Sequence, residues 1–285
     1  MSAAILFALL SLLFAGLVDV VFRRYSRVDR SRGMYVLGMG VVWTALQGLV
    51  VVAMGTDLRI DGRTLAYGLG AGLLVSLANL CLIESLTHID VGLASTVYRL
   101  NTIGVVVMAA ILLAEPLTAI KVAGVLLGVF AVVLLYERGR DAKRQRLFAV
   151  YFWLVVAASL LRAGFGILSK SATSQGVDPQ LLLLVNAPVW ILAGGVYAVF
   201  REKGMRVTIA KVKYSIVSGF LIFAVANFLL LAIARGEASV VVPIANMSFL
   251  VALLISLALG MERLTPRKSA AIALTVVAIV VLAHA

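Results

Sequence analysis

Cysteine and histidine are almost absent from this sequence of 285 residues. The single cysteine is Cys81, and the two histidines are His88 and His284. One cysteine cannot form an intramolecular disulfide, and so few thiol and imidazole groups provide neither an HExxH motif nor a zinc cluster. We therefore expect neither a disulfide framework nor a metal site.

Motifs that bind nucleotides or activate a nucleophile are also missing. The chain has no GxSxG motif and no Walker loop ending in Lys and Ser or Thr. Two groups of glycines lie within apolar runs with no strand before them, so their small size favours close helix packing; they are Gly68, Gly70, Gly72 and Gly124, Gly128. The sequence thus predicts no catalytic residue, no cofactor and no ATP hydrolysis, and we expect the protein not to be an enzyme.

Charged residues make up only 13% of the chain, whereas 63% of the residues are apolar. A soluble domain of this length could not bury so much apolar surface, so the surrounding solvent must be lipid. A membrane span needs about 20 apolar residues. The sequence predicts an all-α integral membrane protein with ten transmembrane helices, at residues 2–22, 34–54, 65–86, 91–114, 118–136, 148–168, 181–200, 214–234, 238–259 and 267–283.

The basic residues stand in short blocks between the apolar runs. A formal charge of +12 could indicate nucleic-acid binding, but this spacing is typical of the positive-inside rule, so we expect no nucleic-acid partner. With the N-terminus outside, the loops on one side hold eighteen Lys and Arg residues and those on the other hold five. The first apolar run has no basic segment before it, which predicts an anchor and not a cleaved signal peptide. We expect both termini outside a bacterial inner membrane.

An internal repeat relates the two halves of the chain. Ala78-Asn79-Leu80 matches Ala226-Asn227-Phe228 at an offset of 148 residues, and the turn Glu115-Pro116-Leu117-Thr118 matches Glu262-Arg263-Leu264-Thr265 at an offset of 147. The repeats are residues 1–136 and 148–285, joined by a basic cytoplasmic linker at 137–147. Five spans per repeat make the second copy enter the membrane from the opposite side. The prediction is a pair of inverted five-helix repeats, an architecture suited to alternating access.

These turns are similar to those of a known family. Leu259-Gly260-Met261-Glu262-Arg263-Leu264-Thr265 resembles the closing signature of EamA-type repeats, and Ala114-Glu115-Pro116-Leu117-Thr118 resembles its first-half counterpart. The first copy departs from the pattern, with Ala114 where glycine is usual and Pro116 where arginine is. The chain resembles ten-helix members of the drug/metabolite transporter superfamily over essentially its whole length. The resemblance implies transport of small metabolites such as amino acids, driven by exchange or an ion gradient.

A charged residue within a span needs a partner or water, because at mid-bilayer it costs about 2.5–3.5 kcal/mol. Arg99 is eight residues into its predicted helix, about 12 Å along the axis. With Tyr98 and Asn101 beside it, Arg99 could bind a carboxylate or phosphate. Alternatively, an acidic neighbour such as Glu84 neutralises it. Arg162 is the second candidate for substrate binding, or its side chain reaches toward the outer face near Ser169 and Lys170.

Two carboxylates could couple transport to a proton gradient. Asp19 and Glu84 lie near the predicted cytoplasmic ends of their helices, where desolvation would raise the pKa. In the alternative interpretation both are solvated, or they are counter-ions of Arg23 and Arg99.

The remaining candidates are amides and one indole. Asn79 and Asn227 are related by the repeat and either bind the solute or hold helices together. Asn246 follows Pro243, and a proline within a span frees a carbonyl that can face a cavity. Trp190 lies near Pro188 in the same kind of setting, and for both sites packing around a kink is the alternative.

Together these features favour a secondary transporter, exporter or exchanger, of a small polar metabolite, an amino acid or an organic anion. A flippase for lipids or lipid-linked sugars would use the same fold with a lateral opening. A third class, an intramembrane enzyme or a non-catalytic assembly subunit, lacks support because no nucleophile, base or metal cluster is present. The expected partners are the solute and membrane lipids. Ten spans can form a complete pathway, so a monomer is plausible and a homodimer is possible.

Overall fold

The computed structural model describes residues 2–28, 32–85, 94, 97–134, 145–202, 207–260 and 264–285. Within these ranges every regular element is a helix and none is a strand. The helices are α1 (Ala3–Val28), α2 (Gly33–Ala53), α3 (Gly62–Ser85), α5 (Asn101–Leu112), α6 (Ala119–Leu134), α7 (Gln145–Ser174), α8 (Pro179–Arg201), α9 (Ile209–Arg235), α10 (Ala238–Asn246), α11 (Phe249–Ala258) and α12 (Pro266–Ala283). Most of the predicted linker 137–147, and residues 91–93, 95 and 96 of a predicted span, lie outside the described residues.

The described helices account for a multi-pass membrane protein. Eight segments are long and apolar enough to cross a membrane, and α10 and α11 together form one of them, Ala238–Ala258. Two shorter apolar helices, Val97–Leu112 and Ala119–Leu134, overlap the two other predicted spans.

The span predicted at 238–259 is not one continuous helix. It is interrupted at Met247 and Ser248, where the Met247 N–H bonds to the Ile244 carbonyl and the Leu250 N–H bonds to the Met247 carbonyl. Pro243, within α10, has no N–H to donate and weakens the helix before the break. A short i to i+3 turn therefore replaces the regular ladder in mid-span.

The same turn occurs in the first half of the chain. The Leu100 N–H bonds to the Val97 carbonyl, and the Ile103 N–H bonds to the Leu100 carbonyl. Each of these three residues lies 147 positions before its counterpart around Met247, which is the offset of the sequence repeat in this region. Both halves thus place a helix break at the same point.

Several helices continue beyond the predicted apolar runs. α1 extends to Val28, and α7 extends from Gln145 to Ser174, well past the predicted end at 168. In α7 the extra turns are held by tertiary contacts, because the Lys170 ammonium donates to the Ile233 carbonyl at 2.9 Å and to the Gly236 carbonyl at 2.7 Å. A hydropathy pattern cannot register such contacts.

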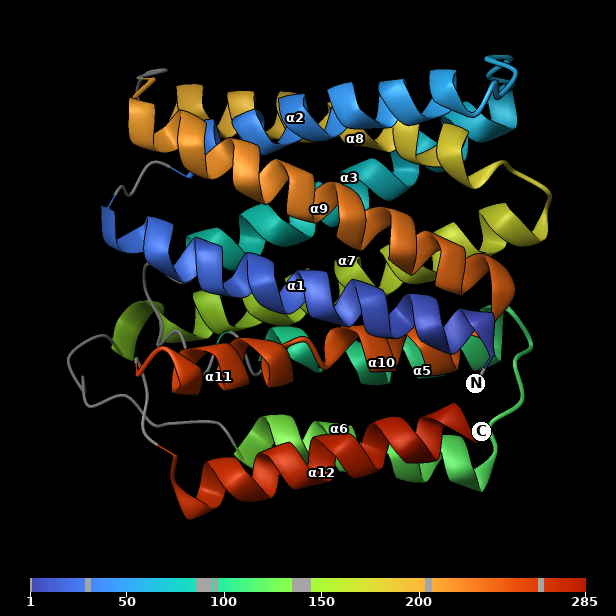
Figure 1. Cartoon of the computed structure of the whole chain (residues 1–285), viewed down its shortest axis with the longest axis vertical. Coiled ribbons are helices and arrows are strands. Elements are labelled where there is room, and N and C mark those ends of the chain that lie inside the picture. Colours follow the sequence, from blue (N-terminus) through green and yellow to red (C-terminus); the bar gives the residue numbers. More distant parts are fainter. Residues whose placement is uncertain are drawn as a thin grey trace.

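The helices pack in pairs, and each pair joins one helix from the first half of the chain to one from the second half (Figure 1). α2 packs against α8 at one end of the long axis, and α6 packs against α12 at the other. Between these pairs, α1 packs against α9 and α3 packs against α7. The N- and C-termini lie at the same side of the bundle.

The α2 and α8 backbones touch where small residues meet. A Cβ added to Gly194 would lie 2.4 Å from the Leu37 nitrogen, and one added to Gly33 would lie 2.6 Å from the Ala198 nitrogen. These separations are shorter than any real Cβ contact, so only glycine permits this approach. The helices can pack so closely because no side chain separates them.

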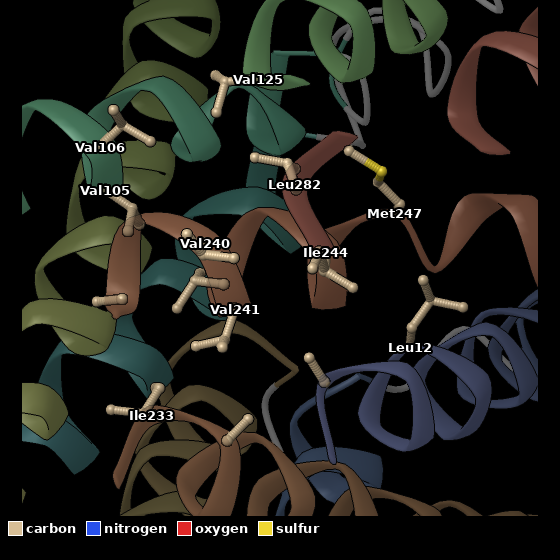
Figure 2. Packing of buried hydrophobic residues seen from close by; sticks show 14 of the residues in the cluster. Leu12, Val105, Val106, Val125, Ile233, Val240, Val241, Ile244, Met247 and Leu282 are labelled. Atoms are coloured by element: carbon tan, nitrogen blue, oxygen red, sulfur yellow. The ribbon is translucent and has the colours of Figure 1, made fainter. Parts of the chain in front are cut away.

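The most buried of the candidate spans is Ala238–Ala258. Figure 2 shows Val240, Val241 and Ile244 of α10 within a cluster of aliphatic side chains. This cluster also takes Leu12 from α1 and Val105 from α5. Since α10 is enclosed by neighbouring helices, its break lies inside the protein and not against lipid.

Short polar side chains begin several helices. Asp178, Thr208 and Thr265 accept hydrogen bonds from the first backbone N–H groups of α8, α9 and α12. Ahead of α3, Asp61 accepts from the Thr64 N–H at 2.7 Å, and hydrogen bonds from Thr64 lower the pKa of the Asp61 carboxyl. A lowered folded-state pKa means that this stabilisation is present above the ordinary carboxyl pKa and is lost as the pH falls through the folded value.

A charged clamp holds the turn between α9 and α10. The Glu115 carboxylate accepts from the Ala238 N–H at 2.8 Å, from the Ser239 N–H at 2.9 Å and from the Ser239 hydroxyl. The Lys121 side chain, 1% exposed, pairs with Glu237 and donates to the Pro116 carbonyl at 2.8 Å. Glu115 and Lys121 thereby bond the turn at residues 115–118 to the start of α10.

Candidate functional site

The two helix breaks meet at Arg99. One guanidinium nitrogen of Arg99 donates to the Asn246 carbonyl and to the Ser248 hydroxyl, both at 3.0 Å. The i to i+3 turn at Met247 leaves the Asn246 carbonyl without an intrahelical donor, so Arg99 satisfies a group that the break exposes. Arg99, from the first half of the chain, therefore supplies the hydrogen-bond donor that this carbonyl of the second half lacks.

Asp19 is the counter-ion of Arg99. The second guanidinium nitrogen of Arg99 lies 2.8 Å from the Asp19 carboxylate, and the Ser248 hydroxyl lies 3.4 Å from the same oxygen. The guanidinium also sits 5.5 Å from the centre of the Phe249 ring. The side chains of Arg99 and Asp19 are 21% and 41% exposed, so the pair is not sealed in the core.

Amide side chains extend this network across the halves. The Asn246 amide donates to the Asn101 side-chain oxygen at 3.0 Å and to the Thr102 hydroxyl at 3.3 Å. Asn101 is 2% exposed, and its own amide nitrogen has no hydrogen-bond partner among the described residues. We call Asp19, Arg99, Asn101, Thr102, Asn246 and Ser248 the break cluster.

Tyr98 and Arg162 form a neighbouring pair. The Arg162 guanidinium donates to the Tyr98 hydroxyl at 3.3 Å and lies 5.3 Å from the centre of the Tyr98 ring. Tyr98 directly precedes Arg99 in the chain, so α7 brings a second arginine close to the break cluster.

Glu84 lies elsewhere. Its carboxylate accepts from the Tyr197 hydroxyl at 2.9 Å and pairs with Arg201, both at the α8 end of the bundle. Leu80 and Cys81 line a shallow, open depression with these three residues. The structure thus pairs Arg99 with Asp19 and not with Glu84.

The other predicted site residues have partners outside the break cluster. The Asn79 amide donates to the Val75 carbonyl of its own helix at 2.7 Å. The Asn227 amide donates to Gln47 at 2.9 Å and to the Phe223 carbonyl of its own helix at 2.9 Å. The Trp190 ring packs edge-on against Trp43, with 5.7 Å between centroids.

Sequence reasoning did not single out Ser248, Thr102, Phe249 or Gln47. The repeat offset contained a signal for Ser248, because residue 248 is the counterpart of Asn101 and residue 246 is the counterpart of Arg99. Serine at 248 attracts no attention by itself, since an uncharged hydroxyl is common in membrane helices. Thr102, Phe249 and Gln47 are ordinary residues in apolar runs, and only their long-range partners mark them.

The first half of the chain matches a known protein family. Residues 2–137 match the model of the EamA-like transporter family. The first half of the chain is therefore similar to the EamA-like transporter family. This family is part of the drug/metabolite transporter superfamily, and its members are membrane transporters.

A solved structure supports the same fold. A protein of known crystal structure is 17% identical in sequence to this chain and superposes on it with a TM-score of 0.82. The alignment covers 99% of this chain and 96% of the other protein. No curated protein matches the sequence. At this identity the similarity concerns the fold of the EamA-like chain.

Proposed function

We propose that this EamA-like chain is a secondary transporter of a small polar metabolite, an amino acid or an organic anion, which it binds between its two halves. The observation that carries the proposal is the bonding of Arg99, from the first half, to the Asn246 carbonyl and Ser248 hydroxyl at the break of the second half. Broken helices expose backbone groups at mid-membrane, as in transporters that bind a solute between repeats. The residues that we propose to contact the solute are Tyr98, Arg99, Asn101, Asn246 and Arg162.

We propose further that ten spans form two inverted five-helix repeats. Helix packing supports this, because the contact of α1 with α9 corresponds to that of α7 with α3 when each helix is replaced by its counterpart. The contact of α2 with α9 corresponds in the same way to that of α8 with α3. The matching breaks at Leu100 and Met247 are a second line of support. Two halves of like structure can exchange conformations, which gives alternating access.

Asp19 is the better placed of the two predicted coupling carboxylates. It bonds directly to Arg99 within the break cluster, whereas Glu84 bonds to Arg201 and Tyr197. Asn79, Asn227 and Trp190 we assign to helix packing.

The basic residues favour an orientation with both termini outside a bacterial inner membrane. The loops predicted to be cytoplasmic carry eighteen of the twenty-five Lys and Arg residues. In the structure both termini lie at the same side of the bundle, as an even number of spans requires (Figure 1).

The test is solute counterflow in proteoliposomes with labelled amino acids and small organic anions. We expect saturable exchange by the wild type and a reduction of at least about tenfold in Arg99→Gln, because glutamine cannot join both halves through a charged fork. Arg59→Gln is the matched control, since the Arg59 side chain is 91% exposed. Absence of exchange for every solute, or a wild-type rate in Arg99→Gln, would contradict the proposal.

A further inference from the structure

We infer that Arg162, and not Arg99, binds the negatively charged group of the transported solute. This assignment rests on the proposed transport function. It identifies the residue that recognises the solute and the chemical class of that solute. It follows from the different surroundings of the two arginines within the membrane.

Arg162 lies in the middle of its span. It is 13 residues from the start and 12 from the end of the apolar segment Ala149–Ser174, about 20 Å and 18 Å along the helix axis. These distances exceed the reach of an arginine side chain, so Arg162 cannot place its charge in the membrane interface. The alternative interpretation, in which Arg162 reaches the outer face near Ser169 and Lys170, is therefore excluded.

The side chain of Arg162 faces the protein. Five of the six residues three, four or seven positions away on α7 are buried, among them Val155, Ala158 and Ser169 at 0%, 0% and 1% exposure. The lipid-facing side of the same helix carries Trp153 and Leu160, which are 66% and 50% exposed. Arg162 is itself half-buried and lies on the same side of α7 as these buried residues.

No carboxylate neutralises Arg162 within the part of the chain that the structure describes. Its polar contact there is the Tyr98 hydroxyl at 3.3 Å, which uses one of the five N–H donors of the guanidinium. Arg99 differs, because Asp19 balances its charge and the Asn246 carbonyl and Ser248 hydroxyl occupy two more donors. Of the two, Arg162 has the charge and the donors available for a ligand.

The ligand group that fits is a small oxyanion. A guanidinium binds the paired oxygens of a carboxylate or phosphate ester through parallel N–H donors. The Tyr98 hydroxyl accepts from Arg162 and so keeps its own hydrogen to donate to the same anion. The Tyr98 ring, 5.3 Å from the guanidinium carbon, adds a cation–π attraction that helps to hold Arg162 in position. A solute with a carboxylate or phosphate group is therefore the substrate class.

Counterflow with matched solutes tests this assignment. The probes are labelled succinate, alanine and glycerol phosphate, each beside its form without the anion, namely succinamide, alaninamide and glycerol. We expect Arg162→Gln to raise the KM for the carried anion at least about tenfold and to lose the preference over the form without the anion, with part of both regained in Arg162→Lys. The three anions separate a carboxylate site from a phosphate site. A wild-type KM and preference in Arg162→Gln would overturn the inference, whereas no exchange of any probe by the wild type counts against the transport function.

A second measurement depends on neither transport nor substrate identity. In a Cys81→Ser background, Tyr98→Cys places a thiol next to Arg162. Relative to free cysteine, we expect this thiol to favour an anionic over a cationic methanethiosulfonate by at least about tenfold, and to lose that preference when Arg162→Gln is added. Equal preference with and without Arg162 would show that no accessible positive site exists there and would overturn the inference.

Discussion

Replacing Asp19 by asparagine is expected to lower the free energy of unfolding by about 2 kcal/mol, because it leaves the Arg99 charge inside the membrane without a counter-ion. Breaking a fully buried pair costs about 3–5 kcal/mol, and an exposed pair contributes at most about 1 kcal/mol. The Asp19 and Arg99 side chains lie between these limits, at 41% and 21% exposure. Denaturant unfolding in mixed micelles measures the change.

A double-mutant cycle identifies the pair as the cause. We expect Asp19→Asn with Arg99→Gln to cost less than the sum of the two single changes, by about 1–2 kcal/mol, since no uncompensated charge remains. The control is Asp57→Asn, which removes the partner of Arg59 in a pair whose side chains are 72% and 91% exposed and should change nothing measurable. Strict additivity of the Asp19 and Arg99 changes would mean that the ion pair does not hold the break cluster.

Replacing Glu115 by alanine should release the start of α10. The carboxylate accepts three hydrogen bonds there, from Ala238 N–H, Ser239 N–H and Ser239 hydroxyl, and a negative charge at a helix N-terminus is favourable. Water can bond to the groups that the carboxylate leaves, so the expected net loss is about 2 kcal/mol, the contribution of about one hydrogen bond to a charged group. Hydrogen exchange of the Ala238 and Ser239 amides should then accelerate roughly 30-fold.

Asp178→Ala is the matched control for that experiment. Asp178 accepts from the Gln180 and Leu181 N–H groups at the start of α8, so its loss should accelerate exchange there and leave α10 unchanged. If Glu115→Ala left the exchange at Ala238 and Ser239 at the wild-type rate, the clamp would not be what orders this turn.

The spans could be located from sequence because lipid imposes a simple rule on long apolar runs. The all-helical architecture and the short turn at Glu115 follow from that rule and from the repeat. The break at Met247 could not be predicted from hydropathy, since Ala238–Ala258 is apolar throughout. What opens the helix is a local i to i+3 turn whose free carbonyl is satisfied by Arg99, far away in the chain.

The sequence indicated Asp19, Arg99 and Arg162 as candidate site residues. It did not indicate which of them bond to one another. The depth of Arg99 and Arg162 follows from counting residues along a helix. The partner of Arg99 could not be chosen by counting, because Asp19 is 80 positions away and Glu84 is much nearer in sequence. Asn79 and Asn227 show the converse, since their matched positions indicated a shared role but their amides bond to helix carbonyls.

Alternating access to the break cluster is most directly tested by thiol labelling of Asn246→Cys in a Cys81→Ser background, in membrane vesicles of both orientations. Asn246 bonds to Asn101 and Arg99 at the junction of the two halves, so a solute pathway must pass it. We expect a membrane-impermeant reagent to modify this position from either side, and an excess of transported solute to slow both reactions. Modification from one side alone, unaffected by solute, would contradict a central site that faces each side in turn.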